Sequence, residues 1–209
     1  MSGLEKNTII DLTKPLDKSF NPFASGKYCD PPLDISEWSS VANEGFRVSR
    51  ISMGTQSGTH VDAPAHFLDE GATLDVLTPD QCVGNFFLLD LPLIACASVV
   101  AGRLDAYRHE KILFLRTPEH QAARISFDVM EKILSLPPLL WVLSGEIEME
   151  HFRPLEFHRL VARAGKFLVE DLDQHAAHLL SGFGEMFALP LRLTGVSGSP
   201  CRVIVRIRA

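Results

Sequence analysis

Four side chains that can bind a metal ion lie close together in this sequence. Gln56, His60, Asp62 and His66 fall within the eleven residues Gln-Ser-Gly-Thr-His-Val-Asp-Ala-Pro-Ala-His. Imidazole and carboxylate groups together suit a borderline divalent ion such as Zn²⁺, and Mn²⁺ and Fe²⁺ are alternatives. The amide oxygen of Gln56 would be a weaker, uncharged ligand. These residue types predict a divalent metal site, with zinc as the first choice.

The flanking residues indicate which elements position these side chains. The segment from Val48 to Met53 alternates apolar and polar residues, which is typical of a strand. In extended chain His60 and Asp62 share one face, because side chains two residues apart point the same way. Pro64 fixes its own φ and disfavours helix in the residue before it, so we expect His66 to return on a turn. A strand followed by a turn can thus bring the four side chains together.

A purely structural role is the alternative for such residues. An isolated His-x-Asp pair is usually a surface pair or a hydrogen-bonded core histidine, and short motifs match by chance. Here the longer pattern Gly-Thr-His-x-Asp-x-Pro-x-His-Phe is complete from Gly58 to Phe67. The complete pattern is far more specific than a two-residue match and favours the metal site.

A closed ligand shell usually draws on distant segments, and the second half of the chain offers two candidates. His158 lies in a predicted helix, and Glu170 follows in an otherwise apolar predicted strand. A charged residue in an apolar run is rarely buried without a partner, although an edge strand would leave it in water. Both explanations of Glu170 stay open on composition alone. His175 and His178, three residues apart, are interpreted as a solvated helix face.

Composition limits the classes of protein to consider. The chain has 209 residues and fits one domain, predicted to span residues 1–209. Its net charge of −6 argues against a nucleic-acid partner. No apolar run approaches the length of a membrane span, and the N-terminus shows no secretory leader, so we expect a cytoplasmic protein that does not bind membranes. The four cysteines are scattered and are expected to be free thiols.

The remaining sequence mixes strands and helices without regular alternation. Strands are predicted at 8–13, 48–53, 85–91, 93–100, 111–117, 139–143, 166–172, 187–193 and 202–207. One helix is predicted to begin with Thr78 as its cap and Pro79 as its first residue, and further helices are predicted at 126–134, 154–165 and 174–180. The segment 14–32 is expected to be a long loop. This pattern predicts a mixed α/β fold and not a doubly wound one.

The segment from Gln56 to Phe67 resembles the signature of the cyclase-like metal-dependent hydrolases, a family that includes bacterial kynurenine formamidase and isatin hydrolase. The family pattern is His-x-Gly-Thr-His-x-Asp-x-Pro-x-His-Phe, and Gln56 stands in place of its first histidine. The resemblance extends to His158, to Glu170-Asp171-Leu172 and to the closing segment 188–202. The segment 143–149 departs from the loop that relatives show near the substrate.

The resemblance implies a swivelling β/β/α fold that forms a homodimer or a higher homo-oligomer. It implies metal ligation by His60, Asp62, His158 and Glu170, with Asp62 or Glu170 able to bridge two ions, so one or two ions are expected. The loop at 14–32 would lead to the mouth of the active site. The residues predicted to contact substrate are the aromatic residues Phe20, Phe23, Tyr28 and Phe67.

These expectations together predict a hydrolase that uses metal-activated water to cleave an amide or a lactone of a small molecule. The amide would be an arylformamide or a cyclic amide. His66 would either join a second metal site or transfer a proton to the leaving amine, and we favour proton transfer. Two alternatives remain. One is a homologue that binds metal or ligand without turnover, and the other is a structural oligomeric module whose histidines only make hydrogen bonds.

Overall fold

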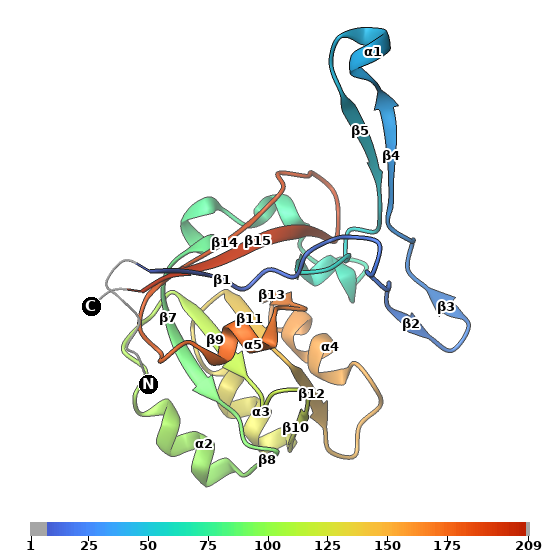
Figure 1. Ribbon diagram of the computed structural model, residues 1–209. Coiled ribbons are helices and arrows are strands. Elements are labelled where there is room, and N and C mark those ends of the chain that lie inside the picture. The colour runs from blue at the N-terminus through green and yellow to red at the C-terminus, as the bar shows by residue number, and fades with distance from the viewer. Residues whose placement is uncertain (1–7, 208–209) are drawn as a thin grey trace.

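A sheet that closes on itself forms the centre of the computed structural model, which describes residues 8–207 (Figure 1). Its strands are β1 (Ile9–Asp11), β6 (His60–Asp62), β7 (Val83–Asp90), β9 (Ile112–Arg116), β11 (Leu140–Ser144), β13 (Phe167–Glu170), β14 (Glu185–Pro190) and β15 (Gly198–Arg206). They lie in the order β1-β15-β14-β7-β9-β11-β13-β6, and β15 also pairs with β6. The extra pairing closes a ring, with β1 attached outside it on β15.

The other elements are shorter. The small strands are β2 (Ala24–Ser25), β3 (Tyr28–Cys29), β4 (Asp34–Ser39), β5 (Val48–Ser52), β8 (Ile94–Ala95), β10 (Ala122–Ile125) and β12 (Glu146–Met149). The α-helices are α1 (Val41–Glu44), α2 (Ala97–Leu104), α3 (Phe127–Leu134), α4 (Glu156–Arg163) and α5 (Gln174–His178). Three 3₁₀ helices are η1 (Pro64–His66), η2 (Leu74–Val76) and η3 (Pro79–Cys82).

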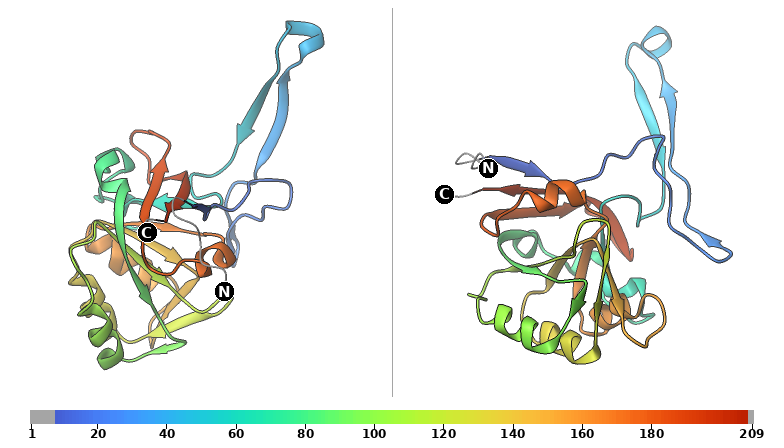
Figure 2. Two further views of the ribbon diagram at one scale, coloured as in Figure 1. Left: turned by 60° about the vertical axis from the view of Figure 1, so that its left-hand side comes forward. Right: turned by 60° about the horizontal axis from the view of Figure 1, so that its bottom comes forward.

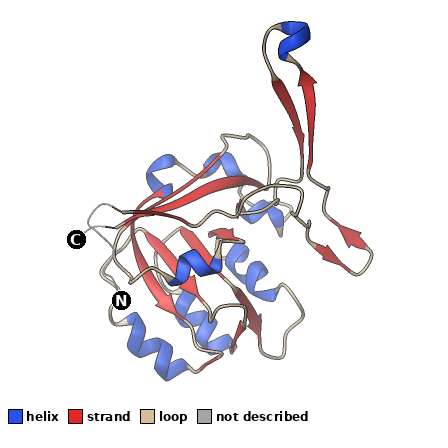
Figure 3. Ribbon diagram, viewed as in Figure 1, coloured by secondary structure: helices blue, strands red, loops and turns tan. Residues whose placement is uncertain are grey.

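Two apolar clusters cover the two faces of the ring. Because side chains alternate along a strand, Phe114 and Val142 point into the ring, where every strand of the ring contributes a buried residue. Their neighbours Leu113 and Trp141 point outward and pack against buried residues of α3 and α4. In Figures 1 and 3, α2, α3 and α4 gather on one side of the sheet. Strands buried on both faces explain the continuous apolar runs in the sequence.

Several local predictions are confirmed, including the mixed α/β fold. The hydroxyl of Ser126 accepts a hydrogen bond from the backbone N–H of Val129 at the start of α3. Thr78 and Gln81 form a capping box around η3, and Pro79 is its first residue. The strands predicted around residues 48–53, 85–91, 111–117, 139–143 and 166–172 correspond to β5, β7, β9, β11 and β13.

The strand predicted at 93–100 is wrong for most of its length. Only Ile94 and Ala95 form a strand, and helix α2 begins at Ala97. A short apolar run fits a buried strand and one face of a helix equally well, so its periodicity could not separate them. The loop predicted at 14–32 is also interrupted, because β2 and β3 pair as a small hairpin within it.

A second hairpin, formed by β4, α1 and β5, stands away from the rest of the chain (Figures 1 and 2). Gly45 makes its turn with a φ of 79°, in the left-handed region that glycine tolerates best. Among residues 8–207, none of the helices combines the length and apolar character needed to span a membrane. Residues 1–7, on which the expectation of no secretory leader depends, lie outside the described part of the chain.

Candidate metal centre

Strand pairing places three ligand-type side chains on one face of the sheet, two from β6 and one from β13. Strand β6 lies between β13 and β15, with Glu170 of β13 opposite His60 in antiparallel register. Residues opposite each other in an antiparallel pair project to the same face, and Asp62 shares that face because it lies two residues after His60. The ligand atoms of His60, Asp62 and Glu170 all lie within 4.8 Å of one another. The pairing of β6 and β13 therefore builds the cluster.

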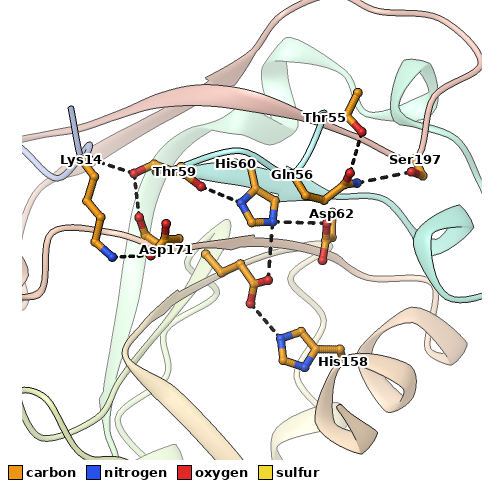
Figure 4. Close-up of polar contacts among 11 residues, drawn as sticks. Lys14, Thr55, Gln56, Thr59, His60, Asp62, His158, Asp171 and Ser197 are labelled. Atoms are coloured by element: carbon orange, nitrogen blue, oxygen red, sulfur yellow. Dashed lines mark hydrogen bonds and ion pairs between the residues drawn. The ribbon is translucent and has the colours of Figure 1, made fainter. Parts of the chain in front are cut away.

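A backbone carbonyl fixes the orientation of the His60 ring. The Nδ1–H of His60 donates to the carbonyl oxygen of Gly58 at 2.7 Å. Since a carbonyl oxygen can only accept a hydrogen bond, Nδ1 carries a proton. The other ring nitrogen, Nε2, faces the two carboxylates. Nε2 lies 3.5 Å from Asp62 Oδ1 and 3.5 Å from Glu170 Oε1. Figure 4 shows the imidazole directed towards Asp62.

Helix α4 supplies a fourth polar group. His158 lies in its first turn, and His158 Nε2 is 2.8 Å from Glu170 Oε2. The other ring nitrogen, Nδ1, is buried without a hydrogen-bond partner. The ring of Phe67 lies 5.7 Å from that of His158, centroid to centroid, and both side chains line a small cavity with Asp62. The structure thus brings His158 and Phe67 to the edge of the cluster.

The charges of the cluster favour a cation at its centre. Burial opposes protonation of His60, yet the carboxylates of Asp62 and Glu170 hold its pKa well above the usual range. Burial also opposes protonation of His158, and the Glu170 carboxylate raises its pKa. Burial would raise the pKa of Glu170, but the two imidazoles lower it instead. Protons or a bound metal ion can provide the positive charge that this arrangement stabilises.

The donor set fits a divalent metal. In a tetrahedral zinc site the ligand atoms lie about 3.3 Å apart, which is close to the distances from His60 Nε2 to the two carboxylates. Asp62 Oδ1 is buried and has no hydrogen-bond partner. A buried acceptor without a partner lowers the stability of the fold by about 1–3 kcal/mol unless a ligand binds it. His60, Asp62 and Glu170, with His158 beside them, are therefore the residues that would hold an ion.

Gln56 lies near the cluster, but its side chain is engaged elsewhere. The hydroxyl of Thr55 donates to Gln56 Oε1 at 2.6 Å, and Gln56 Nε2 donates to Ser197 Oγ at 3.3 Å. Figure 4 shows the amide turned towards Thr55 and Ser197. The two polar atoms of the amide thus bind neighbours that are not part of the cluster. Its role as a metal ligand remains a prediction.

The structure leaves His66 outside the cluster. This residue ends the short helix η1, is exposed, and contacts the edge of the Phe67 ring at 4.6 Å between centroids. Pro64 begins η1, so the predicted turn is present. His66 contacts Phe67, which lines the same small cavity as Asp62 and His158. An exposed imidazole in this position is compatible with proton transfer, which remains a prediction for His66.

The other aromatic residues predicted to contact substrate lie in the N-terminal loop. Phe20 is half-buried, whereas Phe23 and Tyr28 are exposed at or beside the β2–β3 hairpin. The hydroxyl of Tyr28 donates to Asp30 of the same hairpin. Figures 1 and 2 show this hairpin pointing away from the ring, so the structure does not bring Phe23 and Tyr28 to the cluster. Their contact with substrate remains a prediction.

His175 and His178, the two histidines of α5, lie in different environments. His175 is 79% exposed and lies near Glu119, whereas His178 Nε2 is buried without a hydrogen-bond partner. The solvated helix face that we expected therefore applies to His175 and not to His178.

A network of hydrogen bonds and an ion pair around Thr59, next to the cluster, was not predicted from the sequence. The hydroxyl of Thr59 donates to the backbone carbonyl of Asp171 at 2.8 Å and accepts a hydrogen bond from the backbone N–H of Lys14 at 2.9 Å. The Lys14 ammonium pairs with the Asp171 carboxylate. These contacts tie β6 to the residue after Glu170 and to the N-terminal loop. The threonine of the Gly-Thr-His pattern was the available signal for this network.

Comparison with known proteins identifies the family. The family described as "Putative cyclase" matches residues 10–138. A kynurenine formamidase of Bacillus cereus is 26% identical, with 94% of this chain and 96% of the relative covered. Isatin hydrolase A of Labrenzia aggregata, solved with benzyl benzoate, has a TM-score of 0.80 at 19% identity, covering 97% of this chain and 94% of the other. Isatin hydrolase A of Ralstonia solanacearum has a TM-score of 0.77 at 19% identity, covering 96% of this chain and 92% of the other. Because the family match covers more than half of its length, the chain belongs to the cyclase family.

Proposed function

We propose that this protein is a metal-dependent hydrolase that cleaves a non-peptide amide or a lactone in a small molecule. The buried cluster of His60, Asp62 and Glu170 is the observation that carries the proposal. The relatives add the class of bond, since one is a formamidase and the fold neighbours include hydrolases of isatin, a cyclic amide. An arylformamide or a cyclic amide is therefore the preferred substrate class.

The residues of the cluster have distinct roles in this proposal. His60, Asp62, Glu170 and His158 would hold the ion, and the carbonyl of Gly58 keeps His60 Nε2 directed at the carboxylates of the cluster. When bound, a divalent ion lowers the pKa of a coordinated water to about 7 and polarises a carbonyl group. His66 gives a proton to the leaving amine.

Finer features of the proposal follow from the ligand types and from the family. Zinc is the proposed metal and manganese the alternative, because two imidazoles and two carboxylates suit both. One ion or two are proposed, with Asp62 or Glu170 as the bridge. The protein is proposed to be one domain over residues 1–209, cytoplasmic, without a nucleic-acid or membrane partner, and a homodimer or higher homo-oligomer.

A direct test is the metal content of protein purified without added metal or chelator. One or two equivalents of zinc or manganese per chain are expected. A chain that purifies without metal and takes none up on addition would contradict the proposal and would favour a purely structural role for the histidines.

Replacing Gln56 by His is expected to tighten metal binding by about tenfold or more, because imidazole is a better ligand than a neutral amide. The measurement is a competition titration with a chelating dye. Gln56→Ala is the matched control, and it should not tighten binding. If Gln56→His binds metal with the affinity of the natural chain, position 56 does not belong to the ligand shell.

A homologue that binds metal without turnover is the second candidate function. The observation that favours it is the amide of Gln56, which is held by Thr55 and Ser197 where the family pattern has a histidine. Stoichiometric metal without hydrolysis of any arylformamide, cyclic amide or lactone would select this candidate.

A further inference from the structure

The metal cluster lies at the end of the ladder between β6 and β13. Their antiparallel pairing runs from Asp62 and Leu168 to His60 and Glu170, and it ends with that last pair. The ends of a secondary-structure element open more easily than its middle. The distance between the His60 and Glu170 side chains therefore depends on the contacts just beyond the last pair.

The hydroxyl of one buried residue makes the next contact. Thr59 precedes His60 and is only 2% exposed. Its hydroxyl donates to the backbone carbonyl of Asp171, the residue after Glu170, at 2.8 Å. If the antiparallel register continued by one residue, Asp171 would stand opposite Thr59. The Thr59 side chain thus forms a hydrogen bond where the backbone pairing has stopped, and it joins the neighbours of the two ligands.

The backbone at Asp171 depends on such contacts. Its φ is 58°, in the left-handed region that few residues other than glycine adopt, although aspartate tolerates it better than most. A conformation of this kind persists when the surrounding structure holds it. The Thr59 hydroxyl binds the Asp171 carbonyl, and Lys14 pairs with the Asp171 carboxylate. Because Glu170 is the preceding residue, a change in this turn would move the Glu170 carboxylate.

A segment near the N-terminus runs along the residues that follow β13. We call residues 12–16 the strap. The backbone N–H of Asp173 donates to the carbonyl of Leu12 at 2.9 Å, and Thr13 forms an isolated antiparallel bridge with Leu172. Leu12 and Leu172 are both buried inside the ring. The strap is therefore anchored in the core and fixed to the segment after Glu170.

The strap also holds the residues before His60. The backbone N–H of Lys14 donates to the Thr59 hydroxyl at 2.9 Å, as Figure 4 shows. Leu16 packs so closely on Gly58 that a Cβ added there would lie 2.7 Å from Leu16 Cδ2. The carbonyl of Gly58 in turn orients the His60 imidazole. The strap thus contacts both segments that carry the ligands.

We propose that Thr59 is a positioning residue, which together with the strap sets the distance between the metal ligands of β6 and β13 and thereby the affinity for the ion. The proposal rests on the metal-dependent function proposed above. It adds to that function residues that orient the ligands without being ligands. Removing a group that orients a metal ligand typically lowers metal affinity by about 10- to 100-fold.

Titration of the metal-stripped protein with cobalt(II) tests the role of the hydroxyl. Cobalt(II) is a suitable probe because it binds nitrogen and oxygen ligands as zinc does. Thr59→Val keeps the size of the side chain and removes the hydroxyl, so we expect the cobalt dissociation constant to rise by about 10- to 100-fold. Thr59→Ser keeps the hydroxyl and should restore most of the affinity. Competition with a chelating dye measures the constants.

The visible absorption of bound cobalt separates positioning from a general loss of stability. The bands depend on the arrangement of the ligands, so Thr59→Val saturated with cobalt should show altered bands, and Thr59→Ser should match the natural chain. Ser126→Ala is the matched control. It removes the hydroxyl that caps α3, outside the cluster and the strap, and should lower stability without changing the affinity or the bands.

A milder variant covers the case in which Thr59→Val does not fold. Lys14→Met removes the ammonium that pairs with Asp171, and both side chains are 41% exposed, so the fold should be retained. An ion pair this exposed contributes little, so we expect the cobalt dissociation constant to rise by about two- to fivefold. This increase should disappear at high salt, which screens exposed charges.

Results of three kinds would overturn the proposal. Cobalt affinity equal to that of the natural chain in the folded Thr59 and Lys14 variants would overturn it and leave the proposed hydrolase unaffected. Equal weakening in Ser126→Ala and Thr59→Val would show a loss of stability in place of positioning. A natural chain that binds no cobalt would contradict the proposed function and this inference together.

Discussion

Replacing His60 by Ala is expected to abolish metal binding and to lower turnover by about 10³-fold or more. His60 Nε2 lies 3.5 Å from each of the two carboxylates, and its orientation is fixed by Gly58. A metal ion that activates water and polarises a carbonyl lowers the activation free energy by several kcal/mol, and each 1.36 kcal/mol corresponds to a factor of ten in rate. Metal analysis of the purified variant and the rate of formanilide hydrolysis are the measurements.

The matched control is His175→Ala, which removes an imidazole that is 79% exposed and lies near Glu119. This variant should keep its metal and its rate. Retention of stoichiometric metal by His60→Ala would contradict the assignment of the ligand cluster. A rate lowered equally in both variants would indicate a general loss of folded protein.

Replacing Gly198 by Ala is expected to destabilise the fold by about 2–3 kcal/mol and to weaken metal binding. Gly198 lies opposite Asp62 where β15 pairs with β6. An added Cβ would lie 2.6 Å from the backbone carbonyl oxygen of Val61 and 2.4 Å from Gln56 Nε2. The Gln56 side chain can move aside, but the carbonyl moves only with β6, which carries His60 and Asp62. Urea denaturation of the metal-free protein and a metal titration measure the two effects.

Gly102→Ala is the control for this substitution. Gly102 lies within α2, and an added Cβ would meet nothing within 4 Å. Alanine should therefore stabilise the protein by about 0.5–1 kcal/mol, since glycine is unfavourable inside a helix. If Gly198→Ala were as stable as the natural chain, β6 and β15 would not be packed as closely as their pairing indicates.

The part of the site that sequence predicts best is the part that depends on local geometry. His60 and Asp62 share a face because strand side chains alternate, and Pro64 starts the turn to His66. Glu170 is different, because its place opposite His60 depends on the pairing of β13 with β6, more than a hundred residues apart. Composition alone left its burial open, and the family resemblance pointed to it.

Other features were beyond local reasoning. The direction of the Gln56 amide is set by Ser197, which reaches it from the segment before β15. The sequence predicted the strand at 48–53, yet alternation cannot tell whether the faces of a hairpin are covered by the same chain. Similarly, the apolar run at 93–100 contains a helix start at Ala97 that periodicity did not separate from a strand.

The measurement that tests the central claim most directly is hydrolysis of a panel of arylformamides, cyclic amides and lactones by protein stripped of metal with a chelator. We expect no turnover in the stripped protein and recovery of turnover when one or two equivalents of zinc or manganese per chain are added back. Full turnover after complete removal of metal would contradict the account. So would a chain that, with stoichiometric metal bound, hydrolyses none of these substrates.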